Sequence, residues 1–138
     1  MARVYLGMFD DALSDCRAAL RLDPDNLEAY TARGAARVGL KRYQQAMDDL
    51  DRVLAENDTD AEARYFRGLA FAGLGEFDRA VADFSASLDR RPMVADVYYQ
   101  RALAEQKLGR AEAAQADLEQ AFCLDPEVDR ATWVRRSR

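Results

Sequence analysis

Apolar residues recur along the chain at helical spacing. One stripe contains Tyr98 and Ala102, and a second contains Ala114, Leu118 and Ala121. Steps of three and four residues place side chains on one face of an α-helix. A short break at residues 108–110 separates the two stripes. The pattern predicts two helices of about 13 residues joined by a tight turn.

The same pattern returns along the chain at a shift of 34 residues. Leucine, alanine, aspartate and arginine each recur in register, and chance does not align so many residue types at one period. The columns are Leu6, Leu40, Leu74 and Leu108; Ala12, Ala46, Ala80 and Ala114; Asp15, Asp49, Asp83 and Asp117; and Arg33, Arg67 and Arg101. A fixed period of this length predicts a stack of helix–turn–helix units.

Glycine and proline mark the limits of the predicted helices. Glycine suits the turn inside a unit because its backbone is permissive. Proline follows the second helix, which it cannot continue. The positions are Gly7, Gly75 and Gly109 for the turn and Pro24, Pro92 and Pro126 for the end. A separate small column, which includes Gly34 and Gly68, predicts close packing of the two helices of a unit.

The period divides the chain into three full units and two incomplete ends. The full units are 27–60, 61–94 and 95–128. We expect residues 1–26 to supply the end of a first helix and a complete second helix. Residues 129–138 would begin a further first helix, as a basic tail. The chain is then either a fragment of a longer array or an array with incomplete ends. A repeat buries its apolar face only against neighbours, so we expect self-association through the N-terminal end, where five apolar residues lack a covering helix (Met1, Val4, Leu13, Cys16 and Leu20).

The unit resembles the tetratricopeptide (TPR) repeat. Unit 61–94 carries the aromatic, small and closing proline residues of that family at Gly68, Phe71, Gly75, Phe77, Ala80, Phe84 and Pro92. Other positions depart from the family pattern: Asp58, Arg64, Glu105 and Ala111. The resemblance implies an all-α fold, a right-handed superhelical α-solenoid of antiparallel helix pairs, and a role in protein–protein interaction.

The arginine column falls on or near the buried stripe. An arginine in such a place needs an anionic partner. One interpretation is a structural ladder, in which Arg33, Arg67 and Arg101 each pair with an aspartate of their own or the preceding unit. The aspartates of this ladder are Asp15, Asp49, Asp83 and Asp117. The alternative is a row of arginines that binds acidic ligands or nucleic acid. The need for a partner at a buried position favours the ladder.

Some side chains of the first helices lie outside the packed stripe. In TPR arrays, the resemblance implies, this face lines a concave groove that holds peptides. The groove candidates are Thr31, Ala35, Tyr65, Leu69, Tyr99, Leu103 and Gln106. The alternative is that these side chains pack between adjacent units. If they line a groove, their apolar and aromatic character predicts a partner segment of the same character.

Acidic residues form a further column at Glu28, Glu62 and Asp96. As a groove rim they would select a basic segment. As structure, a carboxylate in the first turn of a helix interacts favourably with the helix dipole, and we favour that interpretation. The groove positions carry no positive charge, which argues against the carboxylate clamp by which some TPR domains hold the acidic tails of chaperones.

Composition excludes most chemistry. The chain has no histidine, which removes the commonest general base and metal ligand, and it contains no nucleotide-binding or nucleophile motif. We therefore predict no catalytic residue, no metal site and no cofactor. The net charge of −5 disfavours nucleic acid, whose phosphates must be neutralised on binding.

The remaining sequence features bear on location. No apolar run reaches the ~20 residues that span a membrane, so we expect no membrane contact. Cys16 and Cys123 are far apart and lack the spacing of a metal or redox pair, and we expect both to be buried thiols in a reducing cytoplasm. The resulting prediction is a non-catalytic interaction module that captures a peptide. The alternative is a structural or self-assembly scaffold, or the TPR segment of a larger protein, joined through its incomplete ends.

Overall fold

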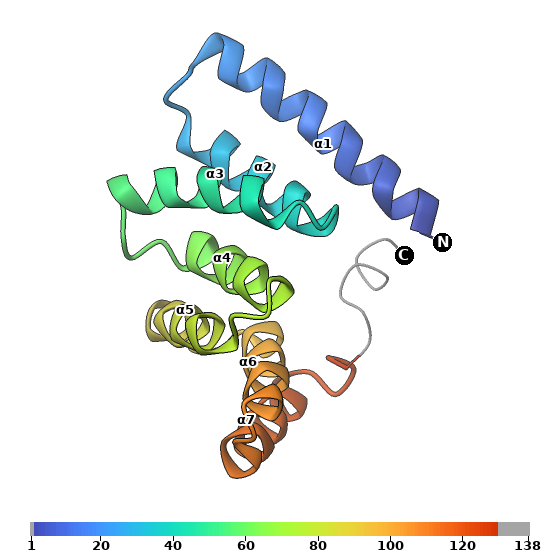
Figure 1. Ribbon diagram of the computed structural model, residues 1–138, viewed down its shortest axis with the longest axis vertical. Helices are drawn as coiled ribbons and strands as arrows, with labels where there is room; N and C mark the ends of the chain where they lie inside the picture. Colours follow the sequence, from blue (N-terminus) through green and yellow to red (C-terminus); the bar gives the residue numbers. More distant parts are fainter. Residues whose placement is uncertain (1, 130–138) are drawn as a thin grey trace.

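The protein is a stack of helices. The computed structural model describes the backbone of residues 2–129 and the side chains of residues 7–129, and this part contains no strand. The helices are α1 (Ala2–Leu22), α2 (Leu27–Gly39), α3 (Tyr43–Glu56), α4 (Ala61–Gly73), α5 (Phe77–Arg90), α6 (Ala95–Lys107) and α7 (Ala111–Leu124). The predicted all-α fold of antiparallel helix pairs is confirmed (Figure 1). The predicted start of a further helix at 129–138 lies, except for Asp129, outside the described residues.

Local chemistry explains where the first helices begin. Asn26 precedes α2, and its side chain accepts a hydrogen bond from the Ala29 amide at 3.1 Å. Asp60 precedes α4 and accepts from the Ala63 amide at 3.0 Å. These caps satisfy amide groups that a helix start leaves without an intrahelical partner. Val94 before α6 offers no such side chain.

The turns inside the units need a left-handed backbone conformation. Gly75 and Gly109 adopt φ angles of 82° and 77°, between α4 and α5 and between α6 and α7. The equivalent residue between α2 and α3 is Lys41, with φ at 62°. A side chain makes this conformation unfavourable. Lysine at this turn of the first full unit is therefore less favourable than the glycine of the other units.

The N-terminal end differs from the prediction. Gly7 lies inside α1, which runs without interruption over Ala2–Leu22, so the expected turn between two helices at Gly7 is wrong. Residues 2–6 continue the helix that contains Gly7 and do not form a separate first helix. Of the apolar residues expected to be uncovered, Cys16 is buried and Leu13 and Leu20 are half-buried. Met1 and the side chain of Val4 lie outside the described part.

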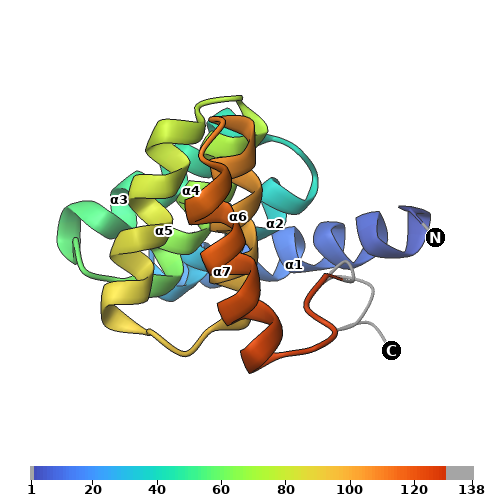
Figure 2. The ribbon, with the colours of Figure 1, turned by 90° about the horizontal axis from the view of Figure 1, so that it is seen from below.

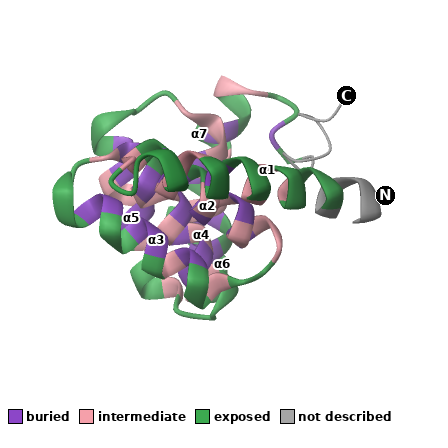
Figure 3. Cartoon of the chain, turned by 90° about the horizontal axis from the view of Figure 1, so that it is seen from above, coloured by how far each residue is buried: buried purple, intermediate pink, exposed green. Residues whose placement is uncertain are grey.

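The helices pack in chain order, each against the next, and form an elongated array (Figure 1). The first helices also meet across units, because α2 contacts α4 and α4 contacts α6. Seen from the α7 end, α1 projects beyond the other helices (Figure 2). Buried positions concentrate in the inner helices, whereas the described part of α1 is largely exposed (Figure 3).

Two apolar clusters fill the array. The first joins α2, α3 and α4 through Leu50, Val53 and Phe66, and the second joins α4, α5 and α6 through residues that include Phe84 and Val97. Helix α4 contributes to both clusters. It is therefore the central element on which the neighbouring units stack.

Glycine permits close approach at two kinds of contact. Within units, a Cβ added at Gly68 would lie 2.6 Å from the Phe84 ring, as the small column predicted. Between units, a Cβ at Gly39 would overlap the ring of Phe9, and a Cβ at Gly73 would overlap the ring of Tyr43. The sequence analysis did not predict this second contact. The rings of Phe9 in α1 and Tyr43 at the start of α3 each pack against the first helix of the next unit.

Candidate functional site

Each full unit contains a buried aspartate bound by an arginine of the same unit. Arg33 donates from Nη2 to Oδ1 of Asp49 at 2.7 Å. Arg67 donates from Nε to Oδ2 of Asp83 at 2.8 Å. The third pair follows the same geometry: Arg101 donates to both carboxylate oxygens of Asp117 at 2.7 Å. These ion pairs connect the first helix of a unit to its second helix.

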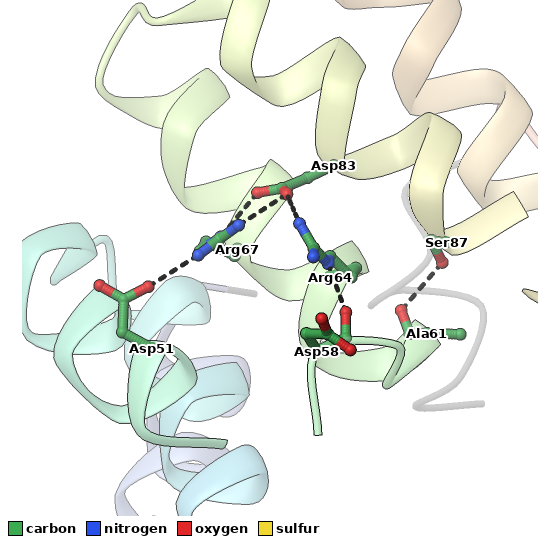
Figure 4. Close-up of polar contacts among 7 residues, drawn as sticks. All are labelled: Asp51, Asp58, Ala61, Arg64, Arg67, Asp83 and Ser87. Atoms are coloured by element: carbon green, nitrogen blue, oxygen red, sulfur yellow. Dashed lines mark hydrogen bonds and ion pairs between the residues drawn. The ribbon is translucent and has the colours of Figure 1, made fainter. Parts of the chain in front are cut away.

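The second partner of the aspartate differs between units. Asp49 also accepts from Arg37 at 2.9 Å, and Asp83 from Arg64 at 3.1 Å (Figure 4). In the third unit the corresponding contact is a hydrogen bond between Glu105 and Asp117.

Two of the arginines also reach the preceding unit. Arg67 donates to Asp51 at 2.9 Å (Figure 4), and Arg101 donates to the Ser85 hydroxyl at 3.1 Å. Asp15 is exposed on α1 and makes no ion pair within the described part of the chain. The arginine column is therefore occupied by contacts inside the array, which leaves it little capacity for an external ligand.

Glu105 is a buried carboxyl group in an unusual setting. Its side chain is 7% exposed, and among the described residues its Oε1 atom has no hydrogen-bond partner. Burial, the largest cause, and the hydrogen bond with Asp117, the next, together raise the pKa of Glu105 to about 7. The nearby positive charges of Arg101 and Arg110 act to lower the pKa. Burial alone would raise the pKa of Asp117, but hydrogen bonds from Arg101 and Glu105 lower it. Glu105 therefore holds a proton close to neutral pH.

Three hollows follow one another along α4. A polar hollow of about 570 Å³ lies at the start of the helix, and a middle hollow of about 290 Å³ shares Ala61, Glu62 and Arg91 with it. An apolar hollow of about 460 Å³ lies towards the end of the helix and shares Tyr65 with the middle one. Neighbouring hollows share lining residues and follow one another along α4, and the three together are here called the α4 groove.

The apolar hollow collects three of the predicted groove residues. Tyr65 and Leu69 of α4 and Leu103 of α6 line it, with Phe77 and Tyr43 contributed by the second helices. Leu103 is 37% exposed, and the other two candidates are half-buried.

Tyr65 combines two roles that the sequence analysis treated as alternatives. Its ring lies 5.3 Å from that of Phe66 and 6.0 Å from that of Phe84, centroid to centroid. One part of the ring packs in the core, and another part borders two of the hollows.

The remaining candidates are spread more widely. Thr31 is buried, donates to the Leu27 carbonyl at 3.1 Å and borders the polar hollow. Ala35 packs against the first apolar cluster. Tyr99 is half-buried and Gln106 is exposed, and neither lines the α4 groove.

The acidic column lies at the beginning of the groove. Glu28 and Glu62 line the polar hollow and Asp96 the middle one, where Arg91 is also present. All three acids occupy the first turn of their helices. The favourable position in the helix dipole and the position on the groove rim are thus compatible.

Sequence reasoning missed part of the apolar hollow. Lys41 comes from the turn after α2, and Tyr43 and Phe77 come from second helices. The search for groove residues covered only first helices, so it had no access to these positions. A usable signal was present, because Lys41 and Lys107 are the only two lysines of the chain and both line this hollow.

Other expected features have simple outcomes. Cys16 is buried as predicted, but Cys123 is exposed, so the second expectation was wrong. No cluster of three or more acidic or cysteine side chains in the described part is placed to bind a metal. None of the described helices is long and apolar enough to cross a bilayer.

Comparison with known proteins identifies the repeat. Models of the tetratricopeptide repeat match residues 4–70, and again residues 61–92 and 95–128. The chain belongs to the tetratricopeptide repeat family. A comparison with curated protein sequences gave no match.

Solved TPR structures share the fold. A structure of MamA from MSR-1 is 27% identical with a TM-score of 0.72, and the match covers 90% of this chain and 71% of that one. MamA from AMB-1 is 29% identical with a TM-score of 0.72, over 85% of this chain and 69% of that one. MamA from Desulfovibrio magneticus RS-1 is 22% identical with a TM-score of 0.76, over 90% and 70%, which shows likeness of fold alone.

Proposed function

We propose that this TPR protein is a non-catalytic interaction module that captures a peptide segment of a partner in the α4 groove. The observation that carries the proposal is the succession of three hollows along α4, with Tyr65, Leu69 and Leu103 together in the apolar one. An elongated depression with an apolar part and a polar rim suits an extended chain, whose backbone needs hydrogen-bond partners and whose side chains need pockets.

The expected affinity is modest. Covering about 400 Å² of apolar surface contributes about 10 kcal/mol at ~25 cal/mol per Å². Association costs of about 4–15 kcal/mol offset most of this gain. We therefore expect micromolar binding, typical of an exchangeable contact.

The lining defines the class of partner. The apolar hollow favours an apolar or aromatic segment, and Glu28, Glu62 and Asp96 favour a basic residue at the beginning of the groove. We propose no nucleic acid partner and no clamp for chaperone tails, because the arginines that would serve such ligands are bound to aspartates inside the array. A reducing cytoplasm suits two cysteines that form no disulfide.

Truncating Leu103 tests the groove. Its side chain is exposed, so Leu103→Ala should leave the fold intact while it removes apolar contact from the hollow. We expect binding of an apolar peptide, followed by fluorescence anisotropy, to weaken by about fivefold to tenfold, which corresponds to roughly 1–1.4 kcal/mol. The matched control is Leu22→Ala, which removes a 90% exposed leucine outside the groove. Equal binding by the two variants would contradict peptide capture at this place.

A second candidate is a scaffold that assembles through the N-terminal end. Met8 on α1 is 49% exposed, and Leu13 and Leu20 on the same helix are only half-buried. An apolar surface on an end helix favours contact with a further helix.

Sedimentation velocity separates the two candidates. If α1 mediates assembly, Met8→Glu should reduce concentration-dependent association and leave peptide binding unchanged, and Leu103→Ala should do the reverse. A wild-type protein that remains monomeric at high concentration would refute assembly through α1.

A further inference from the structure

We propose that the segment captured in the α4 groove carries an acidic side chain beside its apolar residue, and that Lys41 and Lys107 bind this carboxylate. The inference rests on the proposed function and specifies the partner further. The other end of the groove is acidic and favours a basic residue. The partner segment would therefore place its basic residue at that end and its acidic residue beside the two lysines.

The two lysines meet at one hollow although they are far apart in sequence. Lys41 follows the end of α2, and Lys107 is the last residue of α6. Helix α4 lies between α2 and α6 and contacts both. Both lysines line the apolar hollow, together with Gly73 at the end of α4. The two lysines therefore border the same space, one after the end of α2 and the other at the end of α6.

Both lysines stand where the repeat has glycine in other units. Lys41 corresponds to Gly75 and Gly109, and Lys107 corresponds to Gly39 and Gly73. At Lys41 the backbone has a φ of 62°, a conformation that glycine adopts without penalty and a lysine does not. The fold thus does not require a lysine at either place, and at one of them it is disfavoured. A residue kept in an unfavourable conformation beside a hollow indicates a use for its side chain.

The charges of the lysines are available to a ligand. The ion pairs in the described part of the chain all use arginine as the cation, and none uses Lys41 or Lys107. Lysine near a helix C-terminus interacts favourably with the dipole, but this leaves its ammonium group exposed. Both lysines are exposed, so each ion pair formed there is expected to contribute little affinity by itself.

The opposite end of the groove has the opposite balance. Glu28, Glu62 and Asp96 line the polar and middle hollows, where Arg90 and Arg91 compensate only part of the negative charge. Along α4, residues 62–73 span about 16 Å at ~1.5 Å per residue. An extended peptide covers that length with about five residues. The complementary segment is therefore short: a basic residue, an apolar centre and an acidic residue.

Matched synthetic peptides test this inference. The probes are five-residue peptides with acetylated and amidated ends, made of an arginine, three apolar residues and a glutamate, in both chain directions. Each has a partner in which glutamine replaces the glutamate. We expect the better-binding direction to lose about threefold to tenfold in affinity when glutamate becomes glutamine, the range of one or two partly exposed ion pairs.

The repeat itself supplies the protein variants. Lys41→Gly restores the residue found in the other turns, and Lys107→Gln keeps the size of the side chain without its charge. The double variant should fold as well as the wild type and bind the glutamate and glutamine peptides equally. A Lys107→Glu variant should instead prefer a peptide with lysine in place of the glutamate.

The outcomes separate this inference from the proposed function. Equal affinity of wild type for the glutamate and glutamine peptides, with Leu103→Ala still weakening both, would overturn the acidic residue and leave peptide capture standing. No binding of any peptide, or binding insensitive to Leu103→Ala, would overturn both. A peptide whose free C-terminal carboxylate replaces the glutamate side chain with equal affinity would overturn the assignment to a side chain.

Discussion

At the scale of single residues, the buried aspartates show how one repeated position acquires different energetics. Asp49 and Asp83 each bind two arginines, whereas Asp117 binds Arg101 and shares a hydrogen bond with Glu105. A buried carboxylate that loses its only cationic partner is left with the full unfavourable free energy of desolvation. The same substitution should therefore have unequal effects in different units.

Arg101→Ala should destabilise the protein more than Arg67→Ala. Without Arg101, Asp117 has no cationic partner in the described part of the chain, and we expect a loss of about 3–5 kcal/mol. Without Arg67, Asp83 keeps Arg64 at 3.1 Å, and we expect about 1–3 kcal/mol. Urea unfolding followed by circular dichroism measures both values. Equal losses, or a larger loss for Arg67→Ala, would refute this assignment of partners.

Glu105 should make the stability of the protein depend on pH. Burial raises its pKa to about 7 in the folded protein, from an ordinary value of 4.5. Between these values the folded state binds a proton that the unfolded state has released, so the free energy of unfolding should fall as pH rises from about 4.5 to 7, by on the order of 2 kcal/mol. Above pH 7 the dependence should cease. The lowered pKa of Asp117 acts only at more acidic pH.

Two variants provide the controls for this pH dependence. Glu105→Gln keeps a polar side chain of similar size without the titration, and Glu105→Phe reproduces Phe71, the equivalent residue of the preceding unit. Urea midpoints measured from pH 5 to 8 should be nearly constant in both variants. A slope in Glu105→Gln as steep as in the wild type would assign the effect to another group.

At the scale of helices, glycine determines how closely the units stack. Gly73 lies under the ring of Tyr43 and Gly39 under that of Phe9, so α4 and α2 seat against side chains of the preceding units. Interiors are close-packed, and an added methyl group must displace its neighbours. The contact between units therefore depends on the absence of a side chain at these positions.

Gly73→Ala should cost about 1–3 kcal/mol through overpacking against Tyr43. Gly7→Ala provides the matched comparison, because Gly7 is also helical but a Cβ there would meet nothing within 4 Å. Alanine is the better helix former by up to about 1 kcal/mol, so Gly7→Ala should be neutral or stabilising. Thermal unfolding distinguishes the two, and equal melting temperatures would show that Tyr43 moves aside at little cost.

At the scale of the whole molecule, stability should decrease from the centre of the array to its ends. Helix α4 packs against α2, α3, α5 and α6 and belongs to both apolar clusters. Helix α1 has α2 as its main neighbour, and most of its described residues are exposed (Figure 3). In repeat proteins stability arises from contacts between adjacent units, so an end with one neighbour opens more readily.

Hydrogen exchange measures this gradient. We expect amides of α4 and α5 to exchange most slowly and those of α1 to exchange fastest, with α7 between them. Uniform protection from α1 to α7 would indicate a single cooperative unit instead.

The sequence alone was sufficient for the fold, because the signals that define a repeat are local and recur. Helical spacing, the 34-residue period and the glycine and proline positions predicted antiparallel helix pairs and the family. The same local signals failed at Gly7, since a turn also requires a preceding helix to pack against. The same signals identified Tyr65, Leu69 and Leu103 as groove candidates, because the helical period shows which side chains of a first helix lie outside its packed stripe.

Tertiary structure decided the features that depend on stacking. The stacking of the units brings Lys41, Phe77 and Lys107 to one hollow from three successive units, and the spacing within one unit does not predict this. Tyr99 lines none of the three hollows. One side of the Tyr65 ring packs in the core beside Phe84. A periodic sequence determines what each unit is. The contacts between units determine which of their side chains line the surface that a partner can contact.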